Sequence, residues 1–236
     1  MSIQSQTSFA MNVLDAGSLH QVLKEHYPIF QQVAPMSRLD LAAPEASLSL
    51  HEYNLPRLWF LSSDLKELFQ FQEDRLSQNW RRFGPNDTAA EYPGYEAVKS
   101  AFQENIQRVL DWSNREALGQ FSPDVAELFY ENAVPIEGRR LSEILMFFQP
   151  GRQVAVAGLK MAWAEVLTTM AGAIHVHCGI TQMPDGEPAV HVRLVARFVV
   201  QDLTKDAVFG RFDEVHSTIH SLLPYIFTPQ VLEMCA

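Results

Sequence analysis

Cysteine is scarce in this sequence of 236 residues, which contains only Cys178 and Cys235. Two cysteines cannot supply the disulfide framework of a small secreted domain, so the sequence favours a reducing compartment. No run approaches the ~18 apolar residues of a membrane helix, and the amino terminus lacks the basic start and long apolar stretch of a signal peptide. We therefore expect a cytoplasmic protein that does not bind membranes.

Basic residues are also few. The chain has 18 Lys and Arg against 28 Asp and Glu, a formal net charge of -10 at pH 7. Because phosphate contacts supply most non-specific affinity for nucleic acids, this charge argues against broad nucleic-acid binding. The sequence has no glycine-rich phosphate loop, no GxSxG, no CxxC and no HExxH. It therefore indicates no cofactor, and it favours a binding protein over an enzyme.

The composition is that of an ordinary globular protein, with 47% hydrophobic and 19% charged residues. The length fits a single domain over residues 1–236, which could consist of two similar halves of about 1–135 and 136–236. Runs typical of strands alternate with helical runs along the chain. This pattern predicts an α+β protein with a mainly antiparallel sheet and about three helices packed against it.

The amino-terminal third predicts a strand, a helix and a hairpin. Residues 8–14 predict a short strand, and residues 18–30 predict a helix that Ser18 caps. Residues 46–53 alternate well enough for an edge strand, and residues 57–74 predict a hairpin. We expect a polar loop to follow, ending near residue 95.

The rest of the chain predicts further helices and strands. A long helix is expected from Tyr95, another over residues 208–223 that Pro224 ends or kinks, and a short one at 139–148. Thr228 and Pro229 are suitable as N-cap and first residue of a last short helix. The remaining strands are expected at residues 125–134 and 152–170, although the second stretch would also suit a helix.

Residues 173–198, AIHVHCGITQMPDGEPAVHVRLVARF, predict a second hairpin. Pro184, Asp185 and Gly186 suit its turn, which would pair Met183 with Glu187. In this register the even-numbered positions of both strands form one apolar face. The odd-numbered face carries the candidate ligand-binding residues His175, His177, His191, Arg193 and Arg197.

This histidine and arginine face has three interpretations. It could be the solvated side of an ordinary sheet, which is the commonest case. It could instead hold a carboxylate, a phosphate or an acidic partner, because it is a positive strip on an acidic protein. A metal site is the least favoured, since the two strands offer no acidic ligand and the arginines repel cations.

His216 and His220 share one face of the last long helix but lack an obvious third ligand, so no metal is predicted there either.

Several motifs in the middle and at the end of the chain occur together: FQFQEDRLSQNWRR, YPGYEAVKSAF, ELFYENAV and FDEVHSTIHSLLPYIFTP. Their combination resembles a sporadically distributed family of prokaryotic proteins that has no assigned activity. The matching positions are Gln72, Asp74, Arg75, Asn79, Trp80, Arg81, Tyr92, Pro93, Tyr95, Phe102, Tyr130, Asn132 and His216. The patchy occurrence of the family implies a mobile-element, toxin-antitoxin or phage-defence setting.

The middle motif has a structural and a functional interpretation. Its aromatic residues could anchor a loop while Asp74 pairs with an arginine and Pro93 fixes the start of a helix. Alternatively it is a partner-binding surface made of Gln72, Arg75, Asn79, Trp80 and Arg81. Together with the absence of catalytic motifs, the second interpretation predicts a non-enzymatic protein that binds another protein, or a second copy of itself. The alternative is a small anionic-ligand-binding protein or enzyme that uses the face of the second hairpin.

Overall fold

The computed structural model describes residues 1–42, 53, 55–81, 92–148, 158–183, 186–200 and 205–235. Its strands are β1 (Ser2–Ser5), β2 (Ile29–Val33), β3 (Arg57–Leu61), β4 (Glu67–Gln72), β5 (Arg75–Trp80), β6 (Pro123–Pro135), β7 (Lys160–Val166), β8 (Gly172–Gln182) and β9 (Pro188–Val199). Its helices are α1 (Val13–Leu23), α2 (Tyr95–Arg115), α3 (Leu141–Ile144), α4 (Lys205–Ile226) and α5 (Pro229–Cys235).

The predicted α+β class with a mainly antiparallel sheet is confirmed, but the sheet is more extensive than expected and the described residues form five helices rather than about three. The strands are hydrogen-bonded in the order β2-β3-β4-β5-β1-β6-β9-β8-β7.

The chain forms two compact units. Unit 1 consists of residues 1–127 and 197–210, and unit 2 of residues 128–196 and 211–236.

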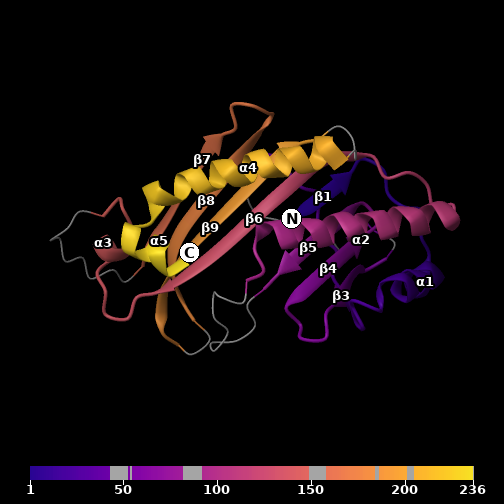
Figure 1. Ribbon diagram of the computed structural model, residues 1–236, viewed down its shortest axis with the longest axis horizontal. Coiled ribbons are helices and arrows are strands. Elements are labelled where there is room, and N and C mark those ends of the chain that lie inside the picture. The colour runs from indigo at the N-terminus through magenta and orange to yellow at the C-terminus, as the bar shows by residue number, and fades with distance from the viewer. Residues whose placement is uncertain are drawn as a thin grey trace. The chain divides into compact units, whose positions relative to one another are not determined.

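In unit 1, α2 lies over one face of strands β4 and β5 (Figure 1), and α1 packs against α2 and β3. That face is apolar because alternate strand positions carry large side chains, including the fully buried Phe60, Phe69 and Leu76. The hairpin predicted over residues 57–74 is confirmed as the antiparallel pair β3 and β4, which ends at Gln72. Burial of each of these large apolar side chains stabilises unit 1 by about 1.5–3 kcal/mol.

The amino-terminal predictions were partly wrong. Residues 8–14 do not form a strand; the strand is β1, which lies between β5 and β6. Helix α1 begins earlier than predicted because Asn12, rather than Ser18, is its N-cap. The Asn12 side chain accepts from Leu14 N–H at 2.8 Å, and Asp15 accepts from Asn12 N–H at 2.8 Å, which forms a capping box.

The prediction of a polar loop after β4 was wrong for residues 75–80, which form strand β5. The helix predicted from Tyr95 is confirmed as α2. Gly94 precedes it with a φ of 89°, in the left-handed region that glycine adopts without steric cost. The edge strand predicted at residues 46–53 lies outside the described residues, apart from Tyr53.

In unit 2, the helical residues 211–226 of α4 lie over the strands β6, β8 and β9 (Figure 1). Buried Phe212, Val215 and Ile219 share the face of α4 that the apolar spacing predicts. The helix nevertheless continues past Pro224 to Ile226. The described part of the 152–170 stretch contains strand β7, as predicted.

Helix α5 confirms the last predicted helix, although the contacts of Thr228 differ from expectation. Its hydroxyl donates to the carbonyl of Glu143 at 2.7 Å, and its own carbonyl accepts from Val231 N–H at 3.0 Å. The short helix predicted at 139–148 is limited to α3. None of the described helices is both long enough and apolar enough to cross a membrane.

Candidate functional site

The hairpin that carries the predicted histidine and arginine face is present in unit 2. Met183 N–H donates to the carbonyl of Glu187 at 2.8 Å, as the turn predicts, and Gly186 has a φ of 87°. The other two predicted turn residues lie outside the described residues. Even-numbered positions such as Ile174 and Val192 are fully buried. The apolar face therefore lies where the sequence predicts it.

On the opposite face of the hairpin, a glutamate of β6 lies beside the basic residues. His191 Nε2 contacts Glu131 Oε1, and Arg193 Nη2 lies 3.7 Å from the same oxygen. The Arg193 guanidinium also lies over the ring of Phe129, 5.6 Å from its centroid. The positive strip that the sequence suggested is thus partly neutralised within unit 2.

Arg197 and His175 belong to the interior rather than to an open binding face. Arg197 is 1% exposed, and its guanidinium donates to Glu127 Oε2 at 2.7 Å and to the carbonyl of Asp40 at 2.8 Å. His175 is buried, whereas His177 is half-buried. The five predicted ligand-binding residues therefore do not form one accessible surface.

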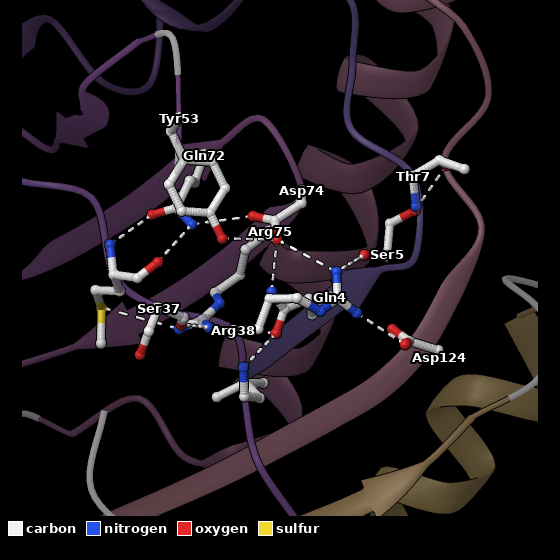
Figure 2. A network of polar contacts seen from close by, with 12 residues as sticks. Gln4, Ser5, Thr7, Ser37, Arg38, Tyr53, Gln72, Asp74, Arg75 and Asp124 are labelled. Carbon is white, nitrogen blue, oxygen red and sulfur yellow. Dashed lines mark hydrogen bonds and ion pairs between the residues drawn. The ribbon is translucent and has the colours of Figure 1, made fainter. Parts of the chain in front are cut away.

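Two residues of the predicted partner-binding surface are also buried. Gln72 accepts from Met36 N–H at 2.8 Å and donates to the Met36 carbonyl at 2.9 Å. Arg75 donates to the carbonyl of Ser37 at 2.5 Å and to Gln4 Oε1 at 3.3 Å (Figure 2). Both side chains hold the segment after β2 against the sheet of unit 1. Their assignment to an exposed recognition surface was therefore wrong.

Asp74 lies at the centre of this polar network (Figure 2). Its Oδ2 accepts from Gln4 Nε2 at 2.6 Å and from the hydroxyl of Tyr53 at 2.9 Å, and its Oδ1 accepts from Gln72 Nε2 at 2.9 Å. Arg38 lies 3.5 Å from Oδ2. A buried carboxylate is retained only when donors satisfy it in this way. The network supports the structural interpretation of the middle motif.

The remaining motif residues lead to a surface that the sequence reasoning missed. Trp59 Nε1 donates to Gln70 Oε1 at 3.0 Å, and Gln70 Nε2 donates to Asn79 Oδ1 at 2.6 Å, which links β3, β4 and β5. The guanidinium groups of Arg57 and Arg81 lie 5.6 and 5.9 Å from the centroid of the Trp59 ring. We call these five half-buried residues the Trp59 patch.

Arg57 is the electrostatically unusual member of the Trp59 patch. Burial, and then the nearby positive charge of Arg75, lower the pKa of Arg57 to about 10. Its Nε is buried without a hydrogen-bond partner, and its Nη1 contacts the sulfur of Met36. Among the described residues no carboxylate lies within 4.0 Å of it. Arg57 is thus a partly desolvated cation that an approaching carboxylate would stabilise.

Trp80 does not belong to the Trp59 patch, because successive side chains of β5 point to opposite faces. Its ring contacts Tyr92 with centroids 5.2 Å apart, close to the start of α2. It therefore anchors the chain before that helix. Arg81, one residue further on, donates from Nε to the carbonyl of Leu65 at 3.0 Å.

The Trp59 patch could have been found from the predicted first hairpin. Placing the turn after Leu61 pairs Trp59 with Gln70, which is the register that the structure shows. Arg57 then lies on the same face, two residues before Trp59. Arg57 and Trp59 precede the family-like motif in the sequence, so the motif alone does not indicate this face.

A second polar cluster joins two of the family-like motifs in unit 2. The hydroxyl of Tyr130 lies 2.7 Å from His216 Nδ1, and the rings of His216 and His220 are 4.3 Å apart. The hydrogen bond orients the His216 ring. Among the described residues no three His, Cys, Asp or Glu side chains are grouped closely enough to hold a metal ion.

An open groove of about 600 Å³ lies beside α4 in unit 2. Its polar lining consists of Glu165, Thr168, Thr169, Glu214, Ser217, Thr218 and Ser221. The Thr218 and Ser221 hydroxyls donate to helix carbonyls at 2.9 and 2.7 Å, and a hydrogen bond from Thr169 lowers the pKa of Glu214. These groups offer acceptors rather than donors to the groove, which does not suit an anionic ligand.

Cys178 is buried on the apolar face of β8, and burial raises the pKa of its thiol to about 11. Only about one molecule in ten thousand then carries the reactive thiolate at pH 7. In a Cys235→Ser variant we expect no measurable modification of the native protein by a thiol reagent, and complete modification after unfolding. Rapid modification of the native variant would contradict this burial.

Comparison of the chain with protein-family models, with curated proteins and with solved structures finds no match. The resemblance to the sporadically distributed prokaryotic family stays a prediction. The function is therefore inferred from the side-chain contacts within each unit.

Proposed function

We propose that the protein is a non-enzymatic interaction protein that binds an acidic segment of another protein through the Trp59 patch. Tryptophan and arginine are the residue types most enriched at the energetic centres of protein interfaces. Hydrogen bonds across three strands hold Trp59 and its polar neighbours before a partner arrives. Such preorganisation lowers the entropic cost of binding.

The state of Arg57 is the observation that carries this proposal. Its guanidinium is partly desolvated and lies close to the charge of Arg75. Among the described residues, no carboxylate lies within ion-pair distance of it. A carboxylate from a partner would offset this cost while an adjacent apolar side chain covers Trp59. Because the chain itself carries a net charge of -10, the patch is a local exception on an acidic protein.

The alternative function, binding of a small anion to the face of the second hairpin, has less support. Glu131 already lies beside His191 and Arg193, and Glu127 neutralises the buried Arg197. An anion at this face would compete with these carboxylates. The family resemblance suggests the biological context of this proposal, which is a mobile-element, toxin-antitoxin or phage-defence system.

The proposal predicts that binding of the native partner depends on Trp59. A tagged protein expressed in its own host should retain a stoichiometric protein partner, and Trp59→Ala or Arg57→Gln should weaken this complex by roughly thirtyfold or more. Gln32→Ala is the matched control, because Gln32 is exposed on neighbouring β2 but pairs with Leu58 on the other face.

Quantitative mass spectrometry of the retained proteins, followed by affinity measurement with the purified partner, checks this prediction. Retention of the same partner at equal affinity by Trp59→Ala would refute binding through the patch. Absence of any partner from the wild-type protein would count against the interaction function itself.

A further inference from the structure

Strand β7 is an exposed edge in unit 2. It is the last strand in the hydrogen-bonding order and pairs with β8 along one side. In the part of the chain that the structure describes, no strand lies along its other side. All of its residues except the half-buried Trp163 are exposed. Such exposure on both faces is unusual for a strand rich in apolar residues.

The hydrogen bonds to β8 show which backbone groups face the open side. Ile180 N–H donates to the Leu159 carbonyl at 3.1 Å, and Leu167 N–H donates to the Gly172 carbonyl at 3.1 Å. Both bonds fit the register that pairs Lys160 with Gly179. Because antiparallel ladders alternate, the odd-numbered residues bond to β8. The backbone groups that point outward belong to Lys160, Ala162, Ala164 and Val166.

The edge also lacks the usual features that prevent pairing. It contains no proline, no register shift is present in its ladder with β8, and its charges, Lys160 and Glu165, lie near its two ends. Met161 and Val166 are 38% and 78% exposed. An edge of this kind is a template for a further strand. We propose that β7 pairs antiparallel with β7 of a second copy and so forms a homodimer.

The open backbone groups restrict the register of this pairing. Only even-numbered residues carry outward N–H and carbonyl groups, so even positions must bond to even positions. The register that uses the whole strand pairs Ala162 with Ala164 of the partner subunit. It places Trp163 opposite Trp163 of the partner subunit, at the two-fold axis. Paired aromatic residues at such positions stabilise sheets.

The ends of β7 are complementary in this arrangement. Antiparallel pairing brings the end that carries Lys160 beside the partner's acidic end, and it sets no like charges opposite each other. The surface also extends beyond the strand, because the 38% exposed Phe147 contacts Trp163 with ring centroids 6.4 Å apart. One strand pair with this flank would be a small interface, and we expect a dissociation constant in the micromolar range.

Analytical ultracentrifugation of charge-swapped variants tests the proposal. A double variant with Ala162→Lys and Ala164→Lys places lysines opposite lysines, and the corresponding double glutamate variant places glutamates opposite glutamates. Each alone should be monomeric at concentrations where the wild type is dimeric, a loss of at least tenfold in affinity. An equimolar mixture of the two should recover a dimer, because every lysine then meets a glutamate.

Two further variants probe the backbone directly. Ala164→Pro removes an outward N–H that β8 does not use and should abolish the dimer, whereas Ala164→Val keeps this N–H and should retain it. Trp59→Ala should leave self-association unchanged, which separates this inference from the proposed partner binding. A wild type that stays monomeric well above micromolar concentration would overturn the inference, as would a dimer that both double variants retain.

Discussion

Replacement of Arg197 by methionine should lower the free energy of unfolding by about 3–5 kcal/mol, because it leaves a partly buried carboxylate without its cation. The Arg197 side chain is 2% exposed and that of its partner Glu127 is 17% exposed. The carbonyl of Asp40 would lose a donor as well. Methionine keeps the aliphatic volume, so the change mainly removes charge and hydrogen bonds.

Arg211→Met is the matched control, because Arg211 forms an ion pair with Glu214 at 3.0 Å but is 47% exposed. Exposed pairs contribute at most about 1 kcal/mol. Urea unfolding followed by circular dichroism measures both variants. Equal destabilisation by the two changes would show that the burial of Arg197 does not determine its contribution.

The surroundings of Arg197 show which parts of this fold the sequence predicts and which it does not. The second hairpin was predictable because its turn residues and its alternation agree within one short segment. The first hairpin and α2 were predictable for the same local reason. The neighbour of β9 was not, since periodicity does not encode which distant strand pairs with it. The sequence therefore predicted that His191, Arg193 and Arg197 share one face, but not that Glu131 and Glu127 of β6 would offset the positive charge of that face.

Strands β1 and β5 were both missed for one physical reason, which is that tertiary hydrogen bonds satisfy their polar side chains. Strand β1, with the sequence SIQS, is buried although most of it is polar. Ser2 bonds to Ser77 at 2.8 Å, and Gln4 donates to Asp74. Strand β5 was mistaken for a loop because its polar residues are satisfied in the same way. Hydrophobic patterning cannot identify a strand whose burial depends on side-chain hydrogen bonds.

The candidate site was predictable to a similar extent. The motif indicated Asn79 and Arg81, which do belong to the Trp59 patch, but it also included Gln72 and Arg75, which are buried. Trp59 itself carries no motif signal. Its importance follows from the cross-strand ladder and from two arginines that the register brings to one ring.

The polar network in unit 1 leads to the second large expected effect, that of Asp74→Asn. Donors approach both oxygens of Asp74: Gln4 and Tyr53 at Oδ2, and Gln72 at Oδ1. In either orientation, an asparagine amide must therefore place its own N–H groups against another donor. We expect a loss of about 3 kcal/mol in the free energy of unfolding, since buried unsatisfied donors and lost charge each cost about 1–3 kcal/mol.

Asp111→Asn provides the control, because Asp111 accepts from Gln107 at 2.8 Å on the exposed side of α2. Surface changes of this kind alter stability by no more than about 0.5 kcal/mol. Hydrogen exchange adds a local measurement. The amides of Met36 and Leu39 donate to Gln72 and Gln4, which Asp74 positions. Their exchange should accelerate in Asp74→Asn beyond what the global loss of stability explains. Unchanged local protection would mean that the segment after β2 is held independently of the buried carboxylate.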